Sequence, residues 1–144
     1  MKIAIATDHA GFCLKEDIKK AFPGYEWQDF GAYSEESVDY PDTGTPAAQA
    51  VANGTCDKGI LICGSGIGMS IVANKVKGIR AALCNTPEIA QLSRMHNDAN
   101  ILVLAGRFTP TPLALEIIKT WFETPFEGGR HQRRINKIRE KYFV

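Results

Sequence analysis

Residues 59–70, Gly-Ile-Leu-Ile-Cys-Gly-Ser-Gly-Ile-Gly-Met-Ser, decide the fold of this chain. The apolar run over residues 59–62 has the length of a buried strand, and the glycine-rich stretch after it indicates a tight turn that opens a helix. Such a turn exposes backbone N–H groups beside the positive end of a helix dipole, where anions bind. The segment therefore predicts a parallel strand that ends in a candidate anion-binding loop.

This loop matches neither of two common nucleotide-binding patterns. Met69 stands where G-x-G-x-x-G has its third glycine, and the phosphate-loop pattern G-x-x-x-x-G-K-[ST] also fails. Two interpretations stay open, an anion cradle and a simple tight turn. Cys63 is likewise either a small buried apolar residue or a base or nucleophile, because thiols near helix N-termini tend towards the thiolate form.

The composition favours one globular domain over residues 1–144. A net charge of +1 predicts neither a nucleic-acid partner nor a membrane surface, and no apolar stretch has the length of a membrane span. The four cysteines lack C-x-x-C spacing and have no paired histidines near them, so we expect no metal. Because a strand-like run follows Met1 directly, we expect a cytoplasmic protein with reduced thiols.

Strand and helix signals alternate along the whole chain. Apolar runs predict strands over residues 2–7, 25–30, 58–63, 79–84 and 100–105. Helical spacing and capping residues predict helices over 11–22, 43–54, 67–76, from Thr86, from Thr111 and over 129–141, with a loop over 34–42. This alternation favours an α/β fold, a three-layer αβα Rossmann-like sandwich with a five-stranded parallel sheet and an extra C-terminal helix.

Ligands of such sheets bind outside the C-terminal ends of the strands. Polar residues follow the predicted strands at four such ends: Asp8 and His9, Cys63 with its loop, Asn85 and Thr86, and Arg107. His96 and Asn97 end the helix just ahead of the last strand, and we expect them to join the same cluster.

Several of these residues also have purely structural interpretations. Asp8 can cap the helix that follows it, and His96 can complement the dipole at a helix C-terminus as well as shuttle protons. Tyr40 lies in a turn and could line a sugar pocket. Arg130 and Arg134, four residues apart, share a helix face that could grip a phosphate dianion, although a solvated basic helix or a nucleic-acid patch fits too.

Five separated motifs together resemble the type B ribose-5-phosphate isomerases, part of a sugar-phosphate isomerase family that also includes galactose-6-phosphate and allose-6-phosphate isomerases. The motifs occur in family order as Thr-Asp-His-Ala-Gly (7–11), Asp-Tyr-Pro-Asp (39–42), Cys-Gly-Ser-Gly-Ile-Gly-Met-Ser (63–70) with Ala-Asn-Lys (73–75), His-Asn-Asp-Ala-Asn (96–100) and Gly-Arg-His-Gln-Arg-Arg (129–134). The resemblance implies an aldose–ketose isomerase that interconverts D-ribose 5-phosphate and D-ribulose 5-phosphate through ring opening and a cis-enediolate, without a cofactor. It also implies homodimers or tetramers whose active sites are completed across the dimer interface.

The same resemblance implies roles for single residues. Cys63 would be the base that moves a proton between C1 and C2; another branch of the family uses a glutamate at the position of Met69, so this chain is similar to the cysteine branch. His96 would open the sugar ring, Ser65 would assist the base or the ring opening, and Asp8 would position hydroxyls. The residues expected to bind substrate are His9, Tyr40, Gly64, Gly66, Gly68, Ser70, Asn97, Arg107, Arg130 and Arg134, with His9 and the arginines on the phosphate.

Three other functions stay open at this point. An isomerase of a hexose 6-phosphate, such as allose or galactose 6-phosphate, would need a deeper pocket, and the sequence does not give pocket depth. A sugar-phosphate binding module without turnover is disfavoured by Cys63, His96 and Asp8. Thiol redox chemistry lacks a resolving cysteine in C-x-x-C spacing.

Overall fold

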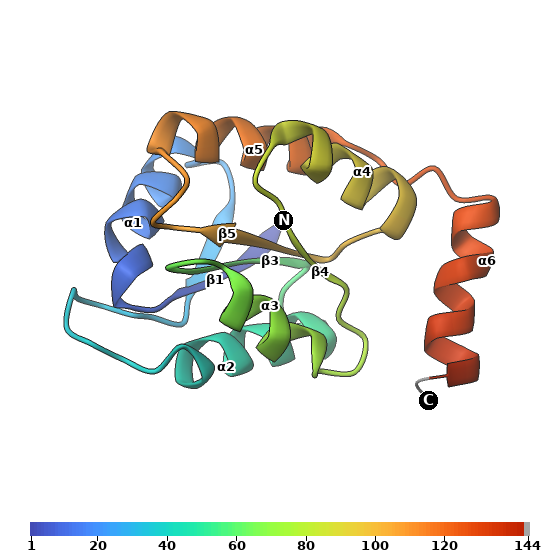
Figure 1. Cartoon of the computed structure of the whole chain (residues 1–144), viewed down its shortest axis with the longest axis horizontal. Helices are drawn as coiled ribbons and strands as arrows, with labels where there is room; N and C mark the ends of the chain where they lie inside the picture. The colour runs from blue at the N-terminus through green and yellow to red at the C-terminus, as the bar shows by residue number, and fades with distance from the viewer. Residues whose placement is uncertain (143–144) are drawn as a thin grey trace.

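The apolar runs pair into one parallel sheet of five strands with the order β2-β1-β3-β5-β4 (Figure 1). The computed structural model describes residues 1–142, so residues 143–144 of the predicted domain lie outside the described part. The strands are β1 (Lys2–Thr7), β2 (Glu26–Asp29), β3 (Lys58–Cys63), β4 (Ala81–Leu83) and β5 (Ile101–Ala105). The predicted α/β fold with a five-stranded parallel sheet is confirmed.

Helices cover both faces of this sheet (Figure 1). One face packs against α1 (Phe12–Ala21), α4 (Pro87–Asn97) and α5 (Thr111–Glu123), and the other against α2 (Tyr40–Ala52) and α3 (Ile67–Asn74). A 3-10 turn, η1 (His9–Gly11), leads into α1. The C-terminal α6 (Arg130–Asn136) continues as the π-helical η2 (Lys137–Tyr142) and stands apart at one end of the molecule.

Alternate side chains of the central strands form two separate apolar cores. In β3, Ile60 and Ile62 point into the core beneath α1, α4 and α5, whereas Leu61 and Cys63 point into the core beneath α2 and α3. Residues 59–63 are buried throughout, as expected for a parallel strand with a layer of helices on either side. The continuous apolar run in the sequence follows from this two-sided burial.

Two predicted boundaries were wrong for local reasons. The loop predicted over 34–42 ends earlier, because α2 already begins at Tyr40, with Asp39 at its N-cap and a proline in its first turn. The strand predicted over 79–84 shortens to β4, an edge strand paired only with β5. Arg80, the residue just before β4, instead donates its amide hydrogen to the Asn100 side chain at 2.8 Å.

A buried lysine ties α1 to the end of β2. Lys15 is fully buried, and its Nζ donates to Asp29 Oδ1 at 2.9 Å and to the Ala32 carbonyl. Lys19 donates to the other Asp29 oxygen at 2.9 Å. Burial opposes ionisation of Asp29, but hydrogen bonds from Lys19, the Gly31 amide and Lys15 outweigh that effect and hold the pKa of the carboxyl below its ordinary value.

None of the helices within residues 1–142 combines the length and the apolar character needed to cross a bilayer.

We expect Asp29→Asn to lower the free energy of unfolding by about 3 kcal/mol at pH 7, because it leaves the charge of Lys15 buried without its partner. A carboxyl whose pKa is depressed on folding stabilises the protein above its unfolded pKa of about 3.9 and loses that effect as the pH falls through the folded value. The difference between the variant and the wild type should therefore shrink below about pH 4. Urea unfolding of the variant and the wild type at pH 7 and below about pH 4 measures this difference in stability. Glu16→Gln, which changes the half-exposed partner of Lys19, is the control. A difference that grows towards low pH would contradict this account.

Candidate active site

Three neighbouring strands, β1, β3 and β5, end side by side at the carboxyl edge of the sheet. The Asp8 amide donates to the Ile62 carbonyl at 3.2 Å, and the Gly106 amide donates to the Cys63 carbonyl at 2.8 Å. The Arg107 amide donates to the Gly64 carbonyl at 3.0 Å. These bonds place Asp8, Cys63 and Arg107 around the end of β3.

The loop between β3 and α3 is held in a conformation that requires glycine. Gly66 has a φ of 77°, and a Cβ added there would lie 2.4 Å from Leu83 Cδ1. The Ser65 hydroxyl accepts a hydrogen bond from the Ile67 amide at 3.2 Å, and the Ser70 amide is used by the carbonyl of Gly66 at 3.0 Å. The other N–H groups of the loop lie at the positive end of α3, beside the buried free thiol of Cys63.

An aromatic ring and a cation flank this loop. A Cβ added at Gly68 would lie 2.6 Å from Cζ of Tyr40, so the phenol ring packs directly over that glycine. A Cβ at Gly64 would lie 3.3 Å from the Arg107 side chain, which is exposed to solvent. Both glycines therefore allow Tyr40 and Arg107 to approach the loop backbone closely. A thiol, backbone donors, a hydroxyl and a guanidinium here suit an anionic ligand that carries hydroxyl groups.

Asp8 and His9 are held in place by the backbone. Asp8 Oδ1 accepts from the Ala10 amide at 2.9 Å and so caps η1, as its structural interpretation predicts. His9 Nδ1 accepts from the Val38 amide at 3.3 Å, a contact that favours the tautomer with its proton on Nε2. That Nε2–H can donate to an anion such as a phosphate oxygen.

The other predicted site residues lie at the opposite, amino edge of the sheet; they are His96, Asn97, Arg130 and Arg134. The prediction that His96 and Asn97 join Cys63 is therefore wrong for residues of the same chain. Helix α4 runs back between two parallel strands, and its last residues therefore arrive where β5 starts. The Asn100 carbonyl accepts from the Gly59 amide at 3.0 Å, whereas Cys63 is level with Ala105. Five residues of parallel strand separate the two levels, a rise of about 16 Å.

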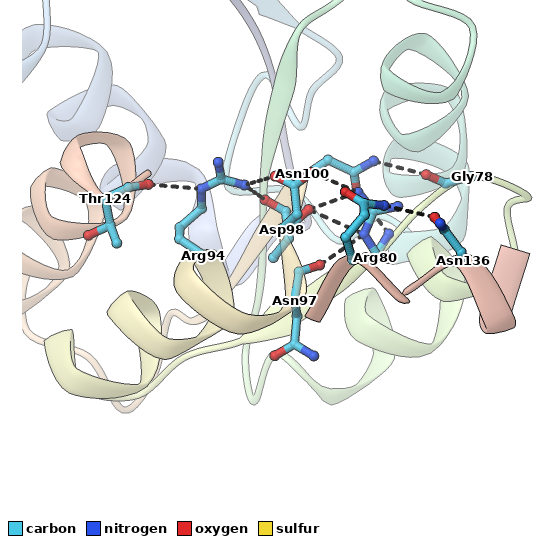
Figure 2. Close-up of polar contacts among 10 residues, drawn as sticks. Gly78, Arg80, Arg94, Asn97, Asp98, Asn100, Thr124 and Asn136 are labelled. Carbon is cyan, nitrogen blue, oxygen red and sulfur yellow. Dashed lines mark hydrogen bonds and ion pairs between the residues drawn. The ribbon is translucent and has the colours of Figure 1, made fainter. Parts of the chain in front are cut away.

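A network of two arginines fixes the turn after His96 (Figure 2). The buried Arg94 donates to Asp98 Oδ1 at 2.8 Å and to the Ala99 carbonyl at 2.7 Å. Arg80 donates to the Asn97 carbonyl at 2.9 Å and to the Asp98 carbonyl at 2.9 Å. Asp98 itself has a φ of 45°, which ends the helix sharply. Sequence reasoning missed these residues, although the i,i+4 spacing of Arg94 and Asp98 is a usable signal.

His96 is also braced from α6. Its ring stacks on that of His131, with ring centroids 4.3 Å apart and an interplanar angle of 14°. Burial, followed by the charges of His96 and Arg130, lowers the pKa of His131. Arg130 and Arg134 are exposed and share a face of α6, as predicted from their spacing. Figure 1 shows α6 at the far end of the molecule from the loop before α3.

A family model described as Ribose/Galactose Isomerase matches residues 3–138. The chain belongs to this family. One relative, the putative sugar phosphate isomerase YwlF of Bacillus subtilis, is 51% identical over 141 residues, which cover 96% of this chain and 95% of the relative. Ribose-5-phosphate isomerase B of Escherichia coli is 48% identical over 139 residues, with 95% and 93% covered.

Solved structures of family members share the whole fold. Ribose-5-phosphate isomerase B of Clostridium thermocellum superposes with a TM-score of 0.95 at 54% identity and covers 97% of this chain and 96% of its own. The corresponding protein of Mycoplasma genitalium, solved with bound ribulose-5-phosphate, superposes with a TM-score of 0.91 at 42% identity, with 95% and 93% covered. Similarity over nearly full length makes the three-layer fold a property of the family.

Alanine substitutions at two glycines distinguish the stability cost of backbone strain from the cost of a steric clash. Gly66 and Gly54 both have a left-handed φ, 77° and 83°, but only Gly54 has open space where a Cβ would be. We expect Gly54→Ala to cost about 1 kcal/mol of stability from strain alone. Gly66→Ala should cost roughly 1–3 kcal/mol more, because Leu83 and the backbone of Leu104 must also move. Equal losses in urea unfolding would show that the loop is not tightly packed.

Proposed function

We propose that the protein interconverts D-ribose 5-phosphate and D-ribulose 5-phosphate, with Cys63 as the base. The observation that carries the proposal is the free thiol at the end of β3, beside the glycine loop and next to Asp8 and Arg107. Relatives named ribose-5-phosphate isomerase B, one of them solved with bound ribulose-5-phosphate, favour this pentose phosphate over a hexose 6-phosphate.

The reaction begins with ring opening, which needs one group to protonate the ring oxygen and another to accept the proton of the C1 hydroxyl. His96 and Ser65 supply these groups in our proposal, because an imidazole and a hydroxyl can each donate or accept a proton. Asp8 orients the sugar hydroxyls. Phosphate held by His9 and the arginines supplies remote binding energy that aligns C1 and C2 with the thiol.

The thiolate of Cys63 then takes the proton from C2. The electron pair of that C–H bond forms the C1–C2 double bond, and the carbonyl oxygen on C1 becomes the enediolate oxyanion. After the hydroxyl proton moves from O2 to O1, the thiol returns its proton to C1 and C2 becomes the carbonyl carbon. Backbone N–H groups of the glycine loop stabilise the oxyanion where the charge develops.

We infer that each active site is completed by a second copy of the chain in a two-fold homodimer. In a single chain, Cys63 and His96 lie at opposite edges of the sheet, so one copy would supply Cys63, Asp8 and Arg107 to each site. The second copy would supply His96, Asn97, Arg130 and Arg134. A two-fold axis then generates two identical sites from four half-sites.

Exposed apolar side chains beside both half-sites support such an interface. Ile67 and Phe108, next to the Cys63 loop, are 58% and 75% exposed. At the other edge, Ile138, which is 47% exposed, lines a groove between α6 and the segment that leads into β4. Apolar surface of this kind is typical of protein interfaces. A tetramer could form by pairing two such dimers.

We propose a single domain over residues 1–144 that works in the cytoplasm without a cofactor, and the four free thiols suit a reducing compartment.

The direct test is an assay of ribulose 5-phosphate formation from ribose 5-phosphate, with and without EDTA. Cys63→Ala should lose at least about 100-fold in kcat with little change in KM, because it removes the general base and leaves the phosphate contacts. Cys13→Ala removes an exposed thiol near the start of α1 that hydrogen-bonds to Glu35 rather than to the glycine loop, and should keep wild-type kinetics. Wild-type kcat in Cys63→Ala would overturn the base assignment. A much higher kcat/KM on allose or galactose 6-phosphate would move the assignment to a hexose phosphate.

A further inference from the structure

The fold brings together two histidines and a glutamate that form no recognisable ligand motif in the sequence. His96 ends α4, Glu127 lies in the linker before α6, and His131 lies in α6. One ligand atom from each of the three lies within 4.8 Å of the other two. The linker is anchored there, because the Glu127 amide donates to the Met95 carbonyl at 3.1 Å.

His131 gives this cluster an unused buried nitrogen. The residue is only 6% exposed, and its Nε2 has no hydrogen-bond partner among the described residues. The nearest acidic atom is Glu127 Oε2 at 3.5 Å, which is too long for a hydrogen bond. A buried nitrogen left in this way is destabilising, and a ligand at the site would satisfy it.

We propose that His96, Glu127 and His131 form a binding site for a late first-row divalent cation such as Zn²⁺. Two imidazoles and one carboxylate are a common three-ligand set for zinc, with a fourth position open to water. The hard cations Mg²⁺ and Ca²⁺ prefer sites built from oxygen alone. Glu127 is exposed and His96 is half-buried, so an ion can enter from solvent.

Binding requires a small rearrangement of one ring. Stacked imidazoles present their lone pairs nearly in parallel, whereas a zinc ion sits about 2.1 Å from each ligand nitrogen along converging directions. His96 is the less buried of the two rings and is the one that has to turn. Arg130 and Arg134 place positive charge on the same helix, which repels a cation. The coordinate bonds from the two imidazoles and the carboxylate therefore have to outweigh this repulsion.

The consequence for activity rests on the function proposed above. If His96 opens the sugar ring, a cation bound to its imidazole removes that acid and base from the reaction. Zn²⁺ should then inhibit turnover, and EDTA should restore it.

Zinc binding is measured directly, by titrating chelator-free protein with Zn²⁺ against a chromophoric chelator. We expect one ion per chain, with affinity reduced at least roughly 10- to 100-fold in His131→Ala and in Glu127→Gln. His9→Ala, which removes a histidine outside the cluster, and Cys13→Ser, which removes the exposed thiol, serve as matched controls and should bind as the wild type does. His131 is buried, so His131→Ala could loosen the packing of α6. Glu127→Gln changes an exposed side chain and tests the site without that disturbance.

Three outcomes decide the proposal. Wild-type affinity in both cluster variants overturns it, as does a thiolate charge-transfer band when Co²⁺ replaces Zn²⁺, because that band would place the ion on a cysteine. Binding that depends on His131 and Glu127 supports the site whether or not the protein isomerises ribose 5-phosphate. Such binding without inhibition of an active enzyme supports the site and overturns only the ring-opening role of His96.

Discussion

Parallel pairing of β3 with β5 is the constraint on which the rest of the structure depends. It aligns Cys63 with Ala105 at one edge of the sheet and Gly59 with Ile101 at the other. Any helix that connects two parallel strands must run back, so α4 delivers His96 to the edge where β5 begins. A single chain therefore carries two half-sites about 16 Å apart in the strand direction, and the chemistry proposed for them requires a second copy.

The sequence predicted the sheet and its layers well because burial on both faces leaves a plain signal. The run over residues 59–63 is apolar without alternation, and the capping position of Asp8 and the shared face of Arg130 and Arg134 depend only on local spacing. The grouping of His96 with Cys63 failed although the necessary signal was present. His96 precedes its strand, whereas Asp8, Cys63 and Arg107 follow theirs, and this difference alone assigns the opposite edge.

The pairing of His96 with His131 could not be predicted in the same way. The two residues belong to helices separated by β5 and α5, and only the packing of α6 on α4 brings their rings together. Spacing rules for metal ligands work when the ligands share one turn or one loop, so they predicted no metal here. The arginine network around Asp98 is a second product of tertiary structure, and it holds the turn that presents His96.

One imidazole then serves two chemistries. The features that suit His96 for proton transfer, a half-exposed ring held by a stacked partner, also suit it for coordination of a cation. The positive charge of Arg130 and Arg134 beside it favours a phosphate anion over a cation. A sugar phosphate and a metal ion would compete for this end of α6, because both would bind next to His96.

The most direct test of the central claim is subunit complementation between Cys63→Ala and His96→Asn. The two inactive variants are mixed, exchange of subunits is verified, and ribose 5-phosphate turnover is measured. If each site takes Cys63 from one copy and His96 from the other, half of the randomly formed dimers are mixed and one of their two sites is intact, so about a quarter of the wild-type activity should return. Activity no higher than that of the separate variants, after complete exchange, would contradict the shared site.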